Sequence, residues 1–283
     1  MALANTGTES GRNGREASRE AVAFLARSEH RVRVLELLGA GEQTRDELKA
    51  ETSATRVTLS RVLGDLEDRG WVTRGATRDR YVLTPFGETI YRDFGQLLDT
   101  VTVGRRLPGM IDRLPEEWFG FDLRHLVDAD RIASESADPH GASRAVANAI
   151  TDADDVRALV GCFTTLPLYA YAEALRTGAA PNAEVVYDEE TTELSLKNDA
   201  ITDQWRRIEE EQSIYYSVDR QYPCTVDLLD DEVVYVSLGR DRGSGFDVLR
   251  STNPVVVDWA RERFERERAD AVPLSERMDE PTP

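Results

Sequence analysis

The sequence predicts an α+β protein with two domains, a small N-terminal domain of short helices and a β-hairpin and a larger α/β domain with a mixed sheet. Three observations predict it. The chain has 283 residues, a usual length for two domains. Residues 15–84 place apolar side chains at helical spacing and then in a hairpin pattern. From Asp155 onward, strand-like and helix-like segments alternate.

The first segment has the apolar periodicity of one long helix, from Arg15 to Leu38, ended by Gly39 and Gly41. Thr44 is then placed to cap a short helix over residues 45–51. Its partner in a capping box would be Glu47, three residues further on. Residues 52–54 form a short turn of the kind that joins two helices of a helix-turn-helix.

The next helix carries two different faces. Its apolar residues follow helical spacing and predict a buried stripe: Leu59, Val62, Leu63 and Leu66. Thr55 is the expected N-cap, and Gly70 suits a left-handed helix stop. The opposite face holds Arg56, Val57, Thr58, Ser60 and Arg61. Arginine can bind guanine through two hydrogen bonds, hydroxyls can reach phosphate or base edges, and valine can contact a thymine methyl. An ordinary solvated face is the alternative interpretation.

A β-hairpin is expected directly after this helix. Trp71 and Val72 begin one strand, residues 75–78 turn, and residues 81–83 return. Helix, turn, helix and hairpin in this order are typical of a winged helix-turn-helix that binds double-stranded DNA, with wing arginines against phosphate or in the minor groove. The predicted DNA-binding residues are Thr55, Arg56, Val57, Thr58, Ser60, Arg61, Arg74, Arg78 and Arg80.

Residues 15–100 resemble the winged-helix domain of archaeal transcription regulators. The segments that carry the resemblance are Leu35-Glu36-Leu37-Leu38, Glu47-Leu48, residues 56–61, residues 66–72, and Tyr81-Val82-Leu83-Thr84-Pro85-Phe86-Gly87, similar to a Y-x-L-T-x-x-G exit from the wing. After residue 15 the chain resembles the methanogenesis-regulator, or filament-regulator, type found in haloarchaea. This resemblance implies a sequence-specific DNA-binding regulator with a C-terminal sensor domain.

The charge is unusual for a DNA-binding protein, because the formal net charge is −18. It is unevenly distributed: residues 1–100 have fifteen basic and sixteen acidic residues, whereas residues 101–283 have twenty and thirty-seven. Lys49 and Lys197 are the only lysines among 35 basic residues. Many carboxylates with almost no lysine suggest a halophilic protein adapted to molar salt, where long-range attraction to phosphate is screened.

Domain boundaries follow from composition. Residues 1–14 and 274–283 are polar and are expected to be disordered, and residues 15–84 form the DNA-binding domain. Residues 85–124 are the expected linker, with a dimerisation helix over residues 84–103 that Pro85 begins. Residues 125–273 are the expected α/β regulatory domain.

The regulatory domain is predicted from its alternating segments. Strands are expected over residues 156–163, 183–187, 214–218, 225–229, 233–238 and 246–250, and helices over residues 166–176, 194–211 and 254–268. Asp230-Asp231 is the expected turn between two of these strands.

Ligands of open α/β sheets bind at the carboxyl ends of strands. Thr164 and Thr165 leave the first of these strands and enter a helix, so they are candidates for binding a small-molecule effector. A plain helix cap is the alternative interpretation.

Catalysis is not expected. His30, His125 and His140 share no metal-ligand spacing, no G-x-S-x-G or phosphate loop is present, and neither a metal nor a cofactor is predicted. Gly239–Gly245 is interpreted as a hairpin loop, with phosphate binding by Arg240 and Arg242 as a weaker alternative. Cys162 and Cys224 are interpreted as buried inert thiols, with a redox pair as the alternative.

No run approaches the ~20 apolar residues of a membrane helix and no signal peptide is recognised, so a cytoplasmic protein without membrane contact is expected.

The sequence therefore predicts a homodimeric, effector-modulated transcription regulator whose recognition helices enter successive major grooves. The alternative is a protein-interaction module whose winged helix does not bind DNA. Hydrolysis by the second domain is the third interpretation, and no catalytic constellation supports it.

Overall fold

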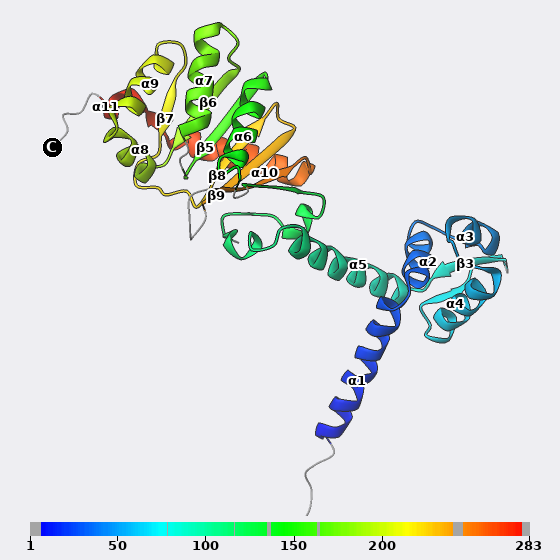
Figure 1. Ribbon diagram of the computed structural model, residues 1–283. Helices are drawn as coiled ribbons and strands as arrows, with labels where there is room; N and C mark the ends of the chain where they lie inside the picture. The colour runs from blue at the N-terminus through cyan, green and yellow to red at the C-terminus, as the bar shows by residue number, and fades with distance from the viewer. Residues whose placement is uncertain are drawn as a thin grey trace, which may run out of the picture. The chain divides into compact units, whose positions relative to one another are not determined.

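The computed structural model describes residues 7–77, 79–115, 117–134, 137–162, 165–239 and 246–278 (Figure 1). The chain divides into two units, residues 1–98 and 99–283, and each is described by itself. Within the described ranges, no helix has both the length and the apolar run needed to cross a bilayer.

The first unit contains short helices and a small sheet. Its elements are α1 (Gly7–Ala26), α2 (Glu29–Gly39), β1 (Gln43–Thr44), α3 (Arg45–Glu51), α4 (Arg56–Asp68), β2 (Val72–Arg74), β3 (Arg80–Leu83) and the start of α5 (Pro85–Arg106). The sheet is antiparallel, in the order β1-β3-β2. Helix α4 follows α3 across a short turn, and the β2–β3 hairpin follows α4. This arrangement is the predicted winged helix-turn-helix.

The predicted helix over residues 15–38 is wrong in one respect, because the chain breaks it at Arg27 and Ser28 into α1 and α2. Ser28 has extended backbone angles, and Arg31 donates from Nη1 to the carbonyl oxygen of Phe24 at 2.8 Å across the break. The break lets Leu25 of α1 and Leu35 of α2 be buried in one core.

Helix α1 also begins earlier than predicted, at Gly7, so residues 7–14 are helical rather than disordered. Once a helix has formed, each residue added to its end gains one backbone hydrogen bond.

The predicted caps of the first unit are confirmed. Thr44 accepts from the backbone N–H of Glu47 at 3.2 Å, and the Glu47 carboxylate accepts from the backbone N–H of Thr44 at 2.6 Å. The hydrogen bond from the Thr44 backbone N–H, followed by that from the Thr44 side chain, lowers the pKa of Glu47. Gly70 has a φ of +67°, as a left-handed helix stop requires.

The Thr84-Pro85-Phe86-Gly87 segment connects the wing to α5 by a specific set of contacts. The Thr84 hydroxyl donates to the Gly70 carbonyl at 2.6 Å and accepts from the Gly87 N–H at 2.9 Å. The Thr84 N–H donates to the Trp71 carbonyl at 3.0 Å. A Cβ on Gly87 would lie 1.9 Å from that same carbonyl oxygen. The motif therefore needs a hydroxyl at its first position and no side chain at its last.

The second unit is a three-layer α/β arrangement with a mixed eight-stranded sheet, as predicted (Figure 1). Its strands are β4 (Asp130–Ala133), β5 (Asp155–Val160), β6 (Asn182–Tyr187), β7 (Ile214–Tyr216), β8 (Thr225–Leu229), β9 (Val233–Gly239), β10 (Phe246–Ser251) and β11 (Val272–Pro273). Its helices are α6 (Gly141–Asp152), α7 (Thr165–Thr177), α8 (Glu189–Leu196), α9 (Asp199–Glu209), α10 (Pro254–Asp270) and α11 (Leu274–Met278), with short 3-10 turns at Ile111–Arg113 and Leu123–Leu126.

The sheet order is β11-β7-β6-β5-β8-β9-β10-β4, with β5, β6 and β7 parallel and the other pairs antiparallel. Helices α6, α7 and α9 cover one face, where Val156, Leu168 and Trp205 are buried together. Helix α10 and residues 103–129 cover the other face, where Val226, Phe264 and Leu107 are buried together. Both faces of the central strands are therefore buried.

Three sequence-based expectations need correction in this unit. The helix predicted over residues 194–211 is two helices, because the Asn198 side chain caps α9 by accepting from the Ala200 N–H at 3.1 Å. Strand β4 and helix α6 were not predicted. The expected disordered tail is ordered up to Met278, since Leu274 is fully buried and β11 pairs with β7. Residues 279–283 lie outside the described part of the chain.

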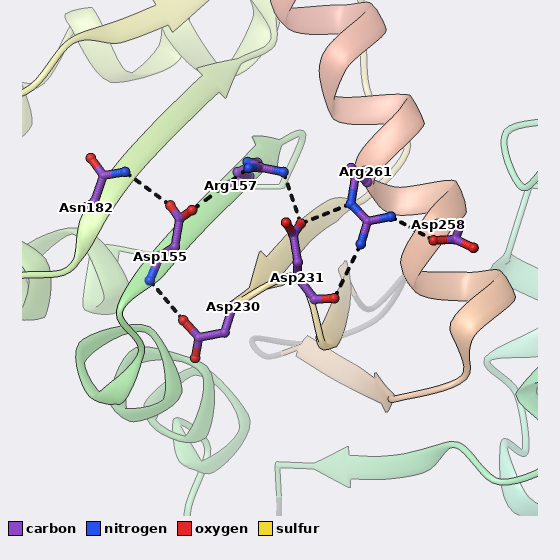
Figure 2. Close-up of polar contacts among 7 residues, drawn as sticks. All are labelled: Asp155, Arg157, Asn182, Asp230, Asp231, Asp258 and Arg261. Carbon is purple, nitrogen blue, oxygen red and sulfur yellow. Dashed lines mark hydrogen bonds and ion pairs between the residues drawn. The ribbon is translucent and has the colours of Figure 1, made fainter.

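The predicted Asp230-Asp231 turn is confirmed, and it is the centre of a polar network (Figure 2). Both residues have positive φ, 54° and 55°. Asp230 Oδ1 accepts from the backbone N–H of Asp155 at 2.9 Å. Asp231 Oδ1 accepts from Arg157 Nη1 at 3.0 Å and from Arg261 Nε at 3.2 Å. The network ties the β8–β9 turn to β5 and α10, which accounts for its acidic pair structurally.

Candidate nucleic-acid interface

The start of α4 is fixed by two threonines. Thr55 is the N-cap, and its hydroxyl accepts from the Thr58 N–H at 3.1 Å and lies 2.9 Å from the Thr58 hydroxyl. Ser60 donates its hydroxyl to the Arg56 carbonyl at 2.8 Å. These predicted contact residues thus first stabilise the helix, and their oxygens retain acceptor capacity for a further donor.

Three side chains of the same helical turns project into solvent. Arg56 and Arg61 are exposed, and Val57 is 80% exposed. Neither arginine side chain has an ion pair or a hydrogen bond to another residue among those the structure describes. The exposed valine and the two arginines together offer one apolar contact and two groups of hydrogen-bond donors to a ligand.

The acidic residues of α4 lie in its second half, where Asp65 and Glu67 are paired within the unit and Asp68 is exposed at the end of the helix. Asp65 is 3.4 Å from Arg31, and Glu67 is 3.1 Å from Arg74. Arg69 lies 3.6 Å above the Phe24 ring, from its guanidinium carbon to the ring centre. The first half of the helix therefore carries two exposed arginines, and two of the three acidic residues of its second half are paired. In helix-turn-helix proteins the N-terminal residues of this helix contact base edges.

The wing arginines are held more tightly than the sequence predicts. Besides its pair with Glu67, Arg74 lies 4.1 Å above the Tyr81 ring. Arg80 donates from Nη1 to the Glu42 carbonyl at 3.2 Å. Arg78 lies outside the described residues. Glu67 and Glu42 were missed by sequence reasoning, since each contacts the wing from outside the hairpin: Glu67 from α4, and Glu42 from before α3.

The structure describes only one of the two predicted effector residues. Thr164 lies outside the described residues, and Thr165 is the exposed first residue of α7.

The two cysteines are free thiols. Cys162 donates from Sγ to the Ser237 carbonyl at 3.0 Å, and burial raises the pKa of both thiols. Burial thus makes both thiols poor nucleophiles. In the described ranges, no group of three His, Cys, Asp or Glu could hold a metal ion.

The described residues combine a winged helix-turn-helix, whose α4 begins with two exposed arginines, with a three-layer α/β unit, and this defines a two-domain architecture. Two family models match this chain in agreement with that architecture. Residues 19–106 match the HVO_A0261 N-terminal domain, and residues 139–270 match the middle domain of the methanogenesis regulatory protein FilR1. The matches support the resemblance to archaeal regulators that the sequence showed.

Solved structures resemble the chain only distantly. A phospholipase D family member, Nuc from Salmonella typhimurium, has 15% identity and a TM-score of 0.40, covering 51% of this chain and 97% of its own. TrmBL2, an archaeal chromatin protein, has 14% identity and a TM-score of 0.36, covering 90% and 100%. NadR in complex with 4-hydroxyphenylacetate has 23% identity and a TM-score of 0.27, covering 39% and 87%. These similarities carry no functional weight. No curated protein matches the chain.

Proposed function

We propose that this protein is a sequence-specific, DNA-binding transcription regulator that acts as a homodimer and responds to a small-molecule effector. The observation that carries the proposal is the exposed, uncompensated pair Arg56 and Arg61 at the N-terminal half of α4. The match of residues 139–270 to the FilR1 middle domain supports a regulatory second unit. The proposal includes no catalytic step.

The recognition mode follows from the chemistry of the exposed face. Arg56 and Arg61 lie five residues apart on α4, and each can donate two hydrogen bonds to one guanine. Val57 lies beside Arg56 and can contact a thymine methyl. The Thr55, Thr58 and Ser60 oxygens can accept from base amino groups. The paired acids further along the helix do not oppose approach to phosphate.

A homodimer is supported by the solvent-facing apolar residues of α5. Leu97, Leu98 and Val101 are 49%, 40% and 51% exposed, and Leu97 and Val101 are one helical turn apart. A row of this kind suits pairing with the same helix of a second copy. Each copy would then present one α4 to a half-site of a near-palindrome.

Replacing Arg61 by alanine should weaken binding to the cognate site about 5- to 150-fold, equivalent to ~1–3 kcal/mol for one base-reading arginine. The measurement is an electrophoretic shift titration on the upstream region of the protein's own gene, with base changes across the bound site. Arg56→Ala should behave similarly at a different base pair. Arg92→Ala is the matched control, since Arg92 is an exposed arginine of α5 that pairs with Asp93. Equal weakening on every sequence would recast Arg61 as a phosphate contact, and full affinity in both variants would favour a protein-interaction module.

Affinity should fall much less steeply with salt than for a basic repressor. The net charge of −18 removes the long-range attraction, and at 1 M salt the Debye length is only ~3 Å. Binding then depends on short-range contacts rather than on counterion release. Titrations from 0.1 M to molar KCl measure the slope directly. A loss of several orders of magnitude over that range would contradict this adaptation to salt.

A further inference from the structure

One buried carboxyl group differs from all the others in the described part of the chain. Asp188, Asp247 and Glu267 are buried and fully engaged: Asp188 accepts from two backbone N–H groups, Asp247 pairs with Arg113 and Arg131, and Glu267 pairs with Arg220 and Arg263. Asp227 is 4% exposed and has no such partner, and its Oδ2 is buried without a hydrogen bond. A buried polar group without a partner destabilises a fold, so its presence needs an explanation.

Asp227 lies at the centre of the sheet. It belongs to β8, where it stands opposite Ala158 of β5 and Tyr235 of β9. Its neighbours in β8 at alternate positions, Thr225 and Leu229, share its face, the one covered by α6, α7 and α9. Burial raises the pKa of Asp227 to about 7, with no hydrogen bond or charge to offset the burial. The surrounding core therefore does not satisfy this carboxyl group.

Two neighbouring cavities, of about 80 and 60 Å³, meet at this carboxyl group. They share five lining residues: Val160, Pro167, Leu168, Tyr187 and Asp227. The first cavity extends between apolar side chains of β5, β6 and α9, and the second adds the hydroxyl groups of Ser143, Thr225 and Ser237. Their combined size is close to the ~150 Å³ of an apolar cavity that accepts benzene. The space suits a molecule of about ten non-hydrogen atoms or fewer.

We propose that this double cavity is a binding site for a small, mostly apolar amine, whose ammonium group pairs with Asp227 while its apolar part packs against Val160, Leu168 and Ala158. The amine would supply the hydrogen-bond donors and the charge that the carboxyl group lacks. A carboxylate ligand would place a second anion against Asp227, and a purely apolar ligand would leave it unsatisfied. Only the role of this ligand as the effector rests on the function proposed above.

The test uses the purified full chain and four probes of similar size: benzylamine, benzyl alcohol, toluene and benzoate. Calorimetric titration at pH 8 should give benzylamine an affinity at least tenfold higher than benzyl alcohol or toluene, and benzoate should not bind. Asp227→Asn should abolish the preference for benzylamine over benzyl alcohol. Equal affinities for benzylamine and toluene, no binding of benzylamine, or an unchanged preference in Asp227→Asn would each overturn the proposal.

Two further variants separate the site from stability and from DNA binding. Ala158→Val adds two methyl groups at the cavity wall and keeps the carboxyl group, and it should weaken benzylamine binding at least tenfold. Arg61→Ala should bind benzylamine as the unsubstituted protein does, since Arg61 belongs to the other unit. If the chain binds benzylamine but not DNA, the ligand site is supported and the proposed function is contradicted. If the chain binds DNA but not benzylamine, the proposed function is supported and the ligand site is contradicted.

Discussion

Gly87→Ala is expected to destabilise the winged-helix unit by about 3 kcal/mol or more, the upper range for overpacking against an immobile neighbour. The added Cβ would lie 1.9 Å from the carbonyl oxygen of Trp71 and 2.7 Å from its carbonyl carbon. These are backbone atoms, and the same oxygen accepts the Thr84 N–H at 3.0 Å. The chain can remove the clash only by moving α5 away from the wing, which also strains the Thr84 hydrogen bonds.

Gly95→Ala is the matched control on the same helix. A Cβ there would meet no atom within 4 Å, so alanine should stabilise α5 by about 0.5–1 kcal/mol. Urea unfolding of both variants, followed by circular dichroism, measures the two changes. Equal small effects of the two substitutions would show that Gly87 does not make this close approach to Trp71.

Asp227→Asn should change how the free energy of unfolding depends on pH. The pKa of Asp227 is about 7 in the folded protein, whereas its usual value is 3.8. The folded state therefore holds a proton that the unfolded chain has lost, so the stability contributed by this group is complete below pH 4 and is lost as pH rises to 7. Between pH 5 and 8 the stability of Asp227→Asn relative to the unsubstituted protein should rise by about 2–3 kcal/mol.

Denaturant unfolding at pH 5, 6.5 and 8 tests this expectation. Asp203→Asn, on the outer side of α9, controls for the loss of one negative charge from a chain of net charge −18. The control should show a much smaller difference between pH 5 and pH 8. A constant stability difference for Asp227→Asn across the three pH values would mean that this carboxyl group is solvated or paired in the folded protein.

Local features of the first unit were predictable from the sequence because each depends on residues close together in the chain. Thr44 and Glu47 lie three residues apart and form their capping box, and Thr55 caps α4 as its position indicates. The buried stripe of α4 follows from helical periodicity alone. Gly70 and the Asp230-Asp231 turn were recognisable because few other residues tolerate a positive φ.

Errors arose where the deciding contact joins distant segments. Nothing in the apolar spacing around Ser28 requires two helices, and the break is explained by the common core that Leu25 and Leu35 enter. The polar tail is ordered because Leu274 is buried and Arg277 pairs with Glu193, 84 residues earlier. Arg80 was predicted to contact the DNA backbone, and in this structure it donates to the carbonyl of Glu42, 38 residues earlier.

The sequence by itself determined the helix, turn, helix and hairpin order of residues 45–83, the caps and turns, and which side chains of α4 face solvent, because these depend on short-range geometry and on the period of a helix. Only the tertiary structure decided which charged groups are compensated. Asp227 looks like any other acidic residue in a chain with 53 of them, and its isolation results from the strands and helices that close around it. In the first unit, packing paired Asp65 and Glu67 of α4 and left the side chains of Arg56 and Arg61 uncompensated, because the partners of a charge are set by proximity in space and not along the chain.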